Sequence, residues 1–126
     1  MKKKILSVDD SAIVRIMLKK GVEGLGYDFS EAADGQEALS VLASEFKETA
    51  LILLDWNMPG MNGMEFLNII KADARYKRIP VMMVTTESEK ASIVKAIQSG
   101  VSNYMLKPFG EDELKKKILA CLGGRT

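Results

Sequence analysis

The 126-residue sequence contains no histidine and a single cysteine, Cys121. The lack of histidine excludes a Ser-His-Asp or Cys-His triad, a histidine zinc site and a role as a phosphohistidine carrier. One cysteine cannot form an internal disulfide, and Cys121 lies among apolar residues, which favours a buried, inert thiol. Any chemistry must therefore use carboxylates, hydroxyls, lysine or a partner.

Long apolar runs and a strong charge excess are also missing. The apolar run at 50–54 is far shorter than the roughly 20 residues that a membrane-spanning helix needs. The basic start is followed by too short an apolar stretch for a signal peptide, so we expect a cytoplasmic protein with no membrane partner. The net charge of +1 leaves no basic excess for binding nucleic acid.

The composition is typical of a folded globular domain, with 47% hydrophobic residues. A chain of 126 residues has room for one core of ordinary size. We therefore expect a single domain over 1–126, without an output domain.

Short runs that favour strands alternate with helical patterns. The strand runs are 4–8, 28–32, 50–54, 80–85 and 103–106, and the helical patterns are 11–25, 35–45, 62–72, 89–99 and 111–122. Near-continuous apolar runs are typical of parallel strands that are covered on both faces. The alternation predicts an α/β fold, a doubly wound five-stranded parallel sheet with helices on both faces.

The helical patterns also carry boundary signals and apolar stripes. Ser11 is a predicted N-cap, and Gly100 is placed to end the helix at 89–99. In that helix, we expect the stripe of Ile93, Val94 and Ile97 to face the core.

Polar side chains follow the predicted strands where each one ends. Asp9 and Asp10 follow the first strand, Asp55 the third and Lys107 the fifth, while Thr85 ends the fourth. In an open parallel sheet, ligands bind beyond the carboxyl ends of the strands. Three carboxylates at one edge would repel one another unless a cation is present, and a set of oxygen donors with room for phosphate favours Mg²⁺.

This spacing suggests roles in phosphoryl transfer. Asp55 is the candidate nucleophile, because a carboxylate can form an acyl phosphate. Mg²⁺ held by Asp10 and Asp55 would neutralise the charge that develops on the transferring group. Lys107 and the Thr85 hydroxyl could contact the remaining phosphoryl oxygens. Alone, Asp9-Asp10 could equally be a favourable charge pair at a helix N-terminus; Asp55 and Lys107 favour the metal site.

Four stretches together identify a family. These are 7–11 (SVDDS), 55–63 (DWNMPGMNG), 84–87 (VTTE) and 104–109 (YMLKPF). They resemble the receiver domain of two-component response regulators, and in particular the stand-alone, CheY-like chemotaxis regulators. The resemblance covers essentially the whole chain. It implies a flavodoxin-like (βα)5 fold with strand order 2-1-3-4-5.

The resemblance also implies a metal site and a phosphoacceptor. Asp55 would accept the phosphoryl group, while Asp10, Asp55 and the backbone carbonyl of Asn57 would bind Mg²⁺ directly. Asp9 would act mainly through a water. Lys107 would contact the phosphoryl group, and its peptide bond to Pro108 would be cis.

A conformational switch is implied as well. Thr85 would move toward the phosphoryl group and Tyr104 would turn inward, changing the surface of the fourth helix, fifth strand and fifth helix. From the residues alone, Tyr104 could equally be a plain core aromatic. Asn57 and Glu87 would favour short-lived phosphorylation. We expect Trp56 to be a half-exposed flank of the site.

The expected function is therefore a signalling switch, not an enzyme. A CheA-like histidine kinase would donate the phosphoryl group, and a flagellar motor-switch protein would be the downstream partner, with a phosphatase as a further candidate. We expect a monomer. The alternatives are a phosphorelay intermediate or a regulator outside motility, an aspartyl-phosphate phosphohydrolase and a flavodoxin-like electron carrier. The hydrolase pattern Asp-x-Asp is missing after Val8, and Asp9-Asp10 would repel the phosphate of FMN.

Overall fold

The computed structural model describes residues 3–86 and 90–123. The strands are β1 (Lys4–Val8), β2 (Asp28–Ala32), β3 (Thr49–Asp55), β4 (Val81–Thr85) and β5 (Asn103–Leu106). The helices are α1 (Ala12–Gly24), α2 (Gly35–Glu45), α3 (Gly63–Lys71), α4 (Lys90–Gln98) and α5 (Glu111–Cys121), with a 3-10 turn η1 (Phe46–Glu48) before β3. None of the helices in these two ranges is long and apolar enough to cross a membrane.

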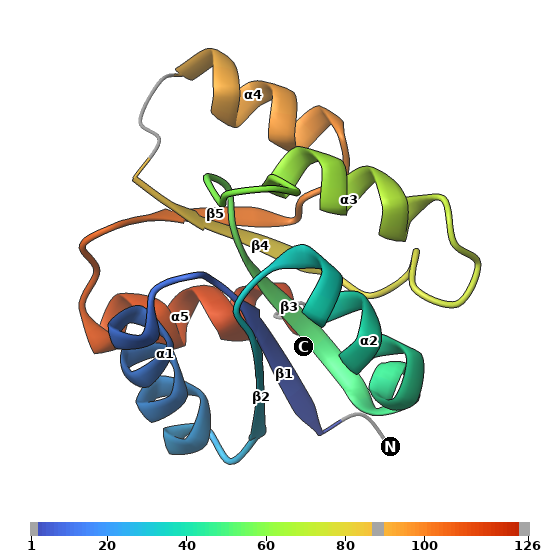
Figure 1. Ribbon diagram of the computed structural model, residues 1–126. Coiled ribbons are helices and arrows are strands. Elements are labelled where there is room, and N and C mark those ends of the chain that lie inside the picture. Colours follow the sequence, from blue (N-terminus) through green and yellow to red (C-terminus); the bar gives the residue numbers. More distant parts are fainter. Residues whose placement is uncertain (1–2, 87–89, 124–126) are drawn as a thin grey trace.

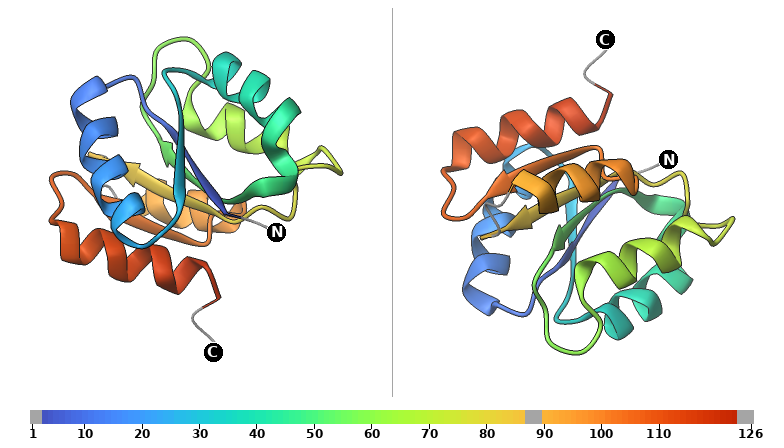
Figure 2. Two further views of the ribbon diagram at one scale, coloured as in Figure 1. Left: turned by 90° about the horizontal axis from the view of Figure 1, so that it is seen from below. Right: turned by 90° about the horizontal axis from the view of Figure 1, so that it is seen from above.

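The strands form one parallel sheet in the order β2-β1-β3-β4-β5, which confirms the predicted fold class and strand order. Helices α1 and α5 cover one face, and α2, α3 and α4 lie on the other (Figure 1, Figure 2). The core accordingly has two parts. The α1/α5 side includes Leu18, Val22, Leu114 and Ile118, and the α2/α3/α4 side includes Ala38, Leu42, Phe66, Leu67 and Ala96.

Local capping sets several helix ends. The Ser11 side chain accepts a hydrogen bond from the N–H of Val14 at 3.2 Å, which confirms the predicted N-cap of α1. Asn62 and Glu65 form a reciprocal capping box at the start of α3. After α4, Gly100 has φ +118°, a conformation that L-residues rarely adopt, so glycine is needed at the turn we predicted there.

The apolar stripe predicted for α4 was wrong in part. Val94 is 46% exposed and Ile97 50% exposed, and the buried residue of the helix is Ala96. The helix lies over the end of the sheet that carries edge strand β5 (Figure 1). Because the sheet ends there, only a narrow face of α4 is covered, and the small side chain of Ala96 allows that face to approach closely. The predicted first residue, Glu89, lies outside the described residues.

Cys121 is only partly buried, whereas we expected full burial. It is the last residue of α5, and its side chain packs against the α1/α5 side of the core without being fully covered. Burial nevertheless raises the pKa of its thiol, against a smaller opposing effect from Lys117. A protonated thiol is a poor nucleophile, which agrees with the predicted inert role.

We predict that Gly63→Ala will destabilise the protein by about 1–3 kcal/mol. A Cβ at this first residue of α3 would lie 2.7 Å from Cε3 of Trp56 and 2.9 Å from the carbonyl oxygen of Asp55. Neither can retreat easily, because the ring is buried and the oxygen belongs to the backbone. Chemical denaturation measures the loss. Gly110→Ala is the matched control, since its Cβ would meet no atom within 4 Å; equal losses would contradict the steric explanation.

Candidate functional site

Three carboxylates meet at the carboxyl edge of the sheet. Asp9 and Asp10 follow β1, and Asp55 is the last residue of β3, the strand beside β1. One oxygen from each carboxylate lies within 4.8 Å of the others. Asp9 and Asp55 are almost completely buried, with 1% and 3% exposed, while Asp10 is exposed. The predicted acidic cluster is therefore assembled by the pairing of β1 with β3.

Asp9 is held by contacts from three residues, one at the end of β2 and two at the start of α1. Its N–H donates to the carbonyl of Ala32 at the end of β2 at 3.0 Å, and its Oδ1 accepts from the N–H of Ser11 at 2.8 Å. The guanidinium of Arg15, on α1, donates to the Asp9 carbonyl and also to Glu31 Oε1, at 2.7 Å. The carboxylate is thus fixed in place before any ligand binds.

Lys107 reaches the acidic cluster from the far side of β4. Its Nζ lies 2.9 Å from Oδ2 of Asp9 and 3.5 Å from Oδ1 of Asp55. Its own N–H donates to the carbonyl of Thr85 at 2.9 Å, which ties the loop after β5 to the end of β4. The peptide bond between Lys107 and Pro108 is cis, as the resemblance implies.

The environment raises the pKa of Asp55 to about 6. Burial is the largest cause, and the neighbouring Asp9 carboxylate raises the pKa further, whereas Lys107 opposes both. Desolvation and a like charge both disfavour the ionised form. At neutral pH the protein therefore holds crowded negative charge that one lysine balances incompletely.

The raised pKa of Asp55 predicts that the stability of the protein depends on pH when EDTA is present. The native pKa of Asp55 is raised above its ordinary 3.8, so its stabilising contribution is complete below about pH 4 and is lost as the pH rises through 6. Relative to Asp55→Asn, the parent protein should lose roughly 2 kcal/mol of unfolding free energy between pH 4 and pH 7. Urea unfolding of both proteins across this range measures the difference, and a constant difference would refute the assignment.

The residues at this edge fit a hard divalent cation. All three carboxylates supply oxygen donors, the type that Mg²⁺ prefers. Among the described residues, the buried Oδ2 of Asp9 accepts no hydrogen bond, and Lys107 is its charge partner. Asn57, in the adjoining loop, donates its N–H to Oδ1 of Asp55 at 3.4 Å, so its backbone lies beside the cluster. Burial is the larger cause of the raised pKa of Asp55, and a metal ion would offset the second cause, the negative charge of Asp9.

Thr85 and Tyr104 lie near this edge on neighbouring strands. Thr85 is buried as the last residue of β4, and Tyr104 of β5 pairs with Met83, two residues before it. Tyr104 is partly buried and packs against the α2/α3/α4 side of the core. This position is compatible with both interpretations of Tyr104. Glu87 lies outside the described residues.

The expectation that Trp56 is half-exposed was wrong, because the side chain is 8% exposed. Side chains alternate between the faces of a strand, and Trp56 continues the set of Ile52 and Leu54 into the α2/α3/α4 side of the core. The absent side chain of Gly63 leaves room for the ring. Met58 is buried in the same cluster.

Sequence reasoning missed two basic residues near the site. Arg15 holds the backbone of Asp9, and Lys117 contacts Tyr104. The sequence did contain a signal for Arg15. It lies one helical turn after the predicted N-cap Ser11, close along the chain to Asp9 and Asp10. No comparable signal exists for Lys117, which lies in a run of three lysines.

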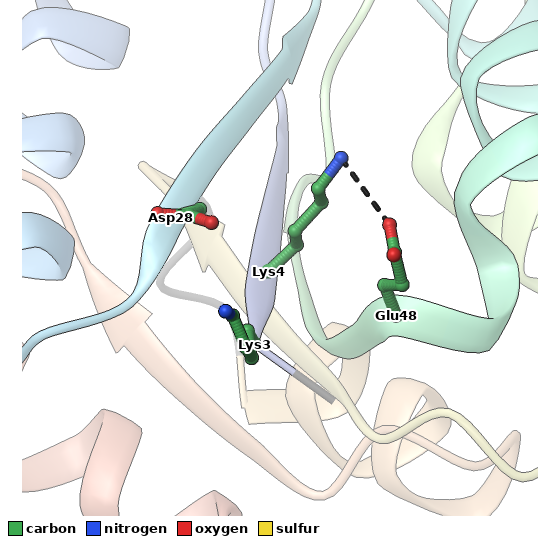
Figure 3. A pocket seen from close by; sticks show the side chains of 4 residues that line it. All are labelled: Lys3, Lys4, Asp28 and Glu48. Carbon is green, nitrogen blue, oxygen red and sulfur yellow. Dashed lines mark ion pairs between the residues drawn. The ribbon is translucent and has the colours of Figure 1, made fainter. Parts of the chain in front are cut away.

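A hollow of about 380 Å³ lies at the opposite edge of the sheet, by the amino ends of β1 and β2 (Figure 3). The hollow is lined by residues of both charges, namely Lys3, Lys4, Asp28 and Glu48. Lys4 forms ion pairs with Glu45 at 3.5 Å and with Glu48 at 3.4 Å. The four lining residues carry two positive and two negative charges, so the hollow has no excess of either sign to attract an ion, and the carboxyl edge is the candidate site.

Comparisons with known proteins agree with this geometry. Residues 5–119 match the family described as the response regulator receiver domain. The chain is 42% identical to the chemotaxis protein CheY1 of Helicobacter pylori, over 95% of this chain and 97% of that protein. It is 43% identical to the chemotaxis protein CheY of Pseudomonas aeruginosa, over 91% of this chain and 92% of that one.

Solved structures show the same fold. The chemotaxis protein CheY4 of Vibrio cholerae superposes with a TM-score of 0.89 at 33% identity, covering 97% of this chain and all of that one. A family match across most of the length, relatives above 40% identity and a shared strand order point the same way. The chain belongs to the response regulator receiver domain family, as a CheY-like member.

Proposed function

We propose that this protein is a phosphorylation switch in which Asp55 accepts a phosphoryl group from a histidine kinase with the help of Mg²⁺. The observation that carries the proposal is the buried meeting of Asp9, Asp10 and Asp55 with Lys107 at one edge of the sheet. Asp10, Asp55 and the carbonyl of Asn57 would hold the metal ion, with Asp9 acting through a water.

The protein's own groups would carry out the transfer as follows. An Asp55 carboxylate oxygen attacks phosphorus, the bond from phosphorus to the donor nitrogen breaks, and an acyl phosphate forms. Lys107 turns from Asp55 to pair with a phosphoryl oxygen, since its ammonium already lies 3.5 Å from the acceptor. The Thr85 hydroxyl donates to another oxygen. A bound Mg²⁺ would supply positive charge to the transferring group.

Phosphorylation would change the surface formed by α4, β5 and α5, to which a downstream partner would bind. Thr85 and Tyr104 lie on adjacent strands, so a movement of Thr85 toward the phosphoryl group can alter the space beside Tyr104. Helix α4 buries little of its apolar surface, a feature typical of segments that shift at low energetic cost. Ligand-dependent populations of two conformers would then couple Asp55 to a partner. Asn57 and Glu87 would tune the lifetime of the acyl phosphate.

The CheY relatives support a role in chemotaxis. A CheA-like kinase would be the donor, a flagellar motor-switch protein the downstream partner and a phosphatase a further partner, with the protein acting as a monomer in the cytoplasm. Residues 1–126 would form one receiver domain. The alternative is the same chemistry in a phosphorelay or in a pathway outside motility.

Acetyl phosphate tests the phosphoacceptor directly. With Mg²⁺ present, intact-mass measurement should show one phosphoryl group, and the same sample with EDTA should show none. Incorporation that ignores EDTA would contradict the metal requirement. Beryllofluoride-treated protein can then be used as bait in the presence of Mg²⁺. Selective capture of a motor-switch component supports chemotaxis, whereas capture of a histidine phosphotransfer protein supports the relay.

A further inference from the structure

Lys117 of α5 contacts Tyr104 of β5 in two ways. Its Nζ donates a hydrogen bond to the carbonyl oxygen of Tyr104 at 2.6 Å, and the same Nζ lies 4.8 Å from the centroid of the Tyr104 ring. The two residues come from different layers, because α5 covers one face and the Tyr104 ring packs against the core of the other. Strand β5 is the edge of the sheet, so no further strand separates Lys117 from the ring.

We propose that Lys117 is a positioning residue that holds the Tyr104 ring in the position seen here, and so sets how readily this ring responds to phosphorylation. The proposal rests on the proposed function in one respect, the role of Tyr104 as a reporter of Asp55. The contact itself is independent of metal and phosphoryl group.

The two contacts have different consequences when the ring moves. The hydrogen bond joins Nζ to the backbone of β5, so it anchors the ammonium whatever the ring does. The cation–π contact exists only while the ring face lies under the ammonium. Lys117 therefore stabilises one ring position relative to all others. A cation–π contact of ordinary strength at a partly exposed site corresponds to about a two- to fivefold change in the ratio of ring positions.

Lys116 provides a matched control on the same helix. Its side chain is exposed, and in the described part of the chain this side chain makes no hydrogen bond, ion pair or ring contact. Lys116→Met and Lys117→Met therefore remove the same charge from the same element, and only the second removes the contact with Tyr104. Lys117→Arg keeps a cation that can lie over an aromatic face.

The test is fluorine NMR of protein labelled with 3-fluorotyrosine, in EDTA and without any phosphoryl analogue. The chain has three tyrosines, and Tyr104→Phe assigns the relevant resonance. Lys117→Met should shift or broaden the Tyr104 resonance, toward its position in parent protein treated with beryllofluoride and Mg²⁺. Lys116→Met should leave it unchanged, and Lys117→Arg should retain most of the parent signal. Thermal unfolding verifies that each variant is folded.

A Tyr104 resonance that is the same in both Met variants would overturn the proposal. So would a shift in Lys117→Met directed away from the beryllofluoride-treated position. Failure of the proposed function has a different signature. In that case the parent resonance would not respond to beryllofluoride and Mg²⁺, although the EDTA comparison of Lys117→Met with Lys116→Met would still report the contact.

Discussion

Asp55→Asn will reduce phosphoryl incorporation from acetyl phosphate at least about 100-fold, because it removes the attacking carboxylate oxygen. The substitution keeps the size of the side chain and deletes one of three crowded charges, so the variant should fold well. In EDTA at neutral pH it should be more stable than the parent, since the raised pKa of Asp55 reports an unfavourable ionised state. The loss of phosphorylation then cannot be attributed to unfolding.

Asp28→Asn is the matched control. Asp28 begins β2 at the opposite edge of the sheet and is exposed, so the same chemical change there should leave phosphoryl incorporation unaltered. Intact-mass time courses with Mg²⁺ compare the three proteins. If Asp55→Asn still took up a phosphoryl group at the parent rate, another residue would have to be the acceptor.

Lys107→Met will lower the unfolding free energy in EDTA at pH 7 by about 2–3 kcal/mol. The ammonium lies 2.9 Å from Asp9 and 3.5 Å from Asp55, two carboxylates that are buried. Its removal leaves their charges without a partner, whereas methionine preserves most of the volume of the side chain. A divalent cation can replace the missing charge, so Mg²⁺ should stabilise Lys107→Met more than it stabilises the parent.

The control for charge removal is Lys20→Met. Lys20 lies 3.9 Å from Glu111, with both side chains exposed, so its loss should change stability by less than about 0.5 kcal/mol. Urea unfolding of the parent and of both variants, with and without Mg²⁺, measures these differences. Equal losses in the two variants, or no larger effect of Mg²⁺ on Lys107→Met, would show that Lys107 does not balance the acidic cluster.

Much of the site was predictable because parallel strands bring their carboxyl ends to one edge. Asp9 and Asp55 could be placed together once β1 and β3 were recognised as neighbours, a step that depended on the family's strand order. The strand boundary itself moved by one residue, which makes Asp55 the last residue of β3 and not the first after it. Alternation along that strand, continued by one residue, would have predicted the burial of Trp56, but the residue was interpreted as a half-exposed flank of the site.

The prediction that the apolar stripe of α4 faces the core was wrong in part for a different physical reason. An apolar pattern identifies the side of a helix that can be buried, but the area that is buried depends on what lies beneath it. Here the sheet ends at β5, and only Ala96 is fully covered. The same edge lets Lys117 reach Tyr104 from the opposite layer, a contact between residues 13 positions apart that no periodicity predicts.

By itself, the sequence determined the fold class and the oxygen-rich chemistry of the site, because hydrophobic periodicity and the residues at strand ends are local properties. The tertiary structure decided how that chemistry is balanced. Lys107 can pair with both Asp9 and Asp55 only because the sheet order carries the loop after β5 back across β4. Burial of those charges, and hence the raised pKa of Asp55, follows from packing in three dimensions and not from spacing along the chain.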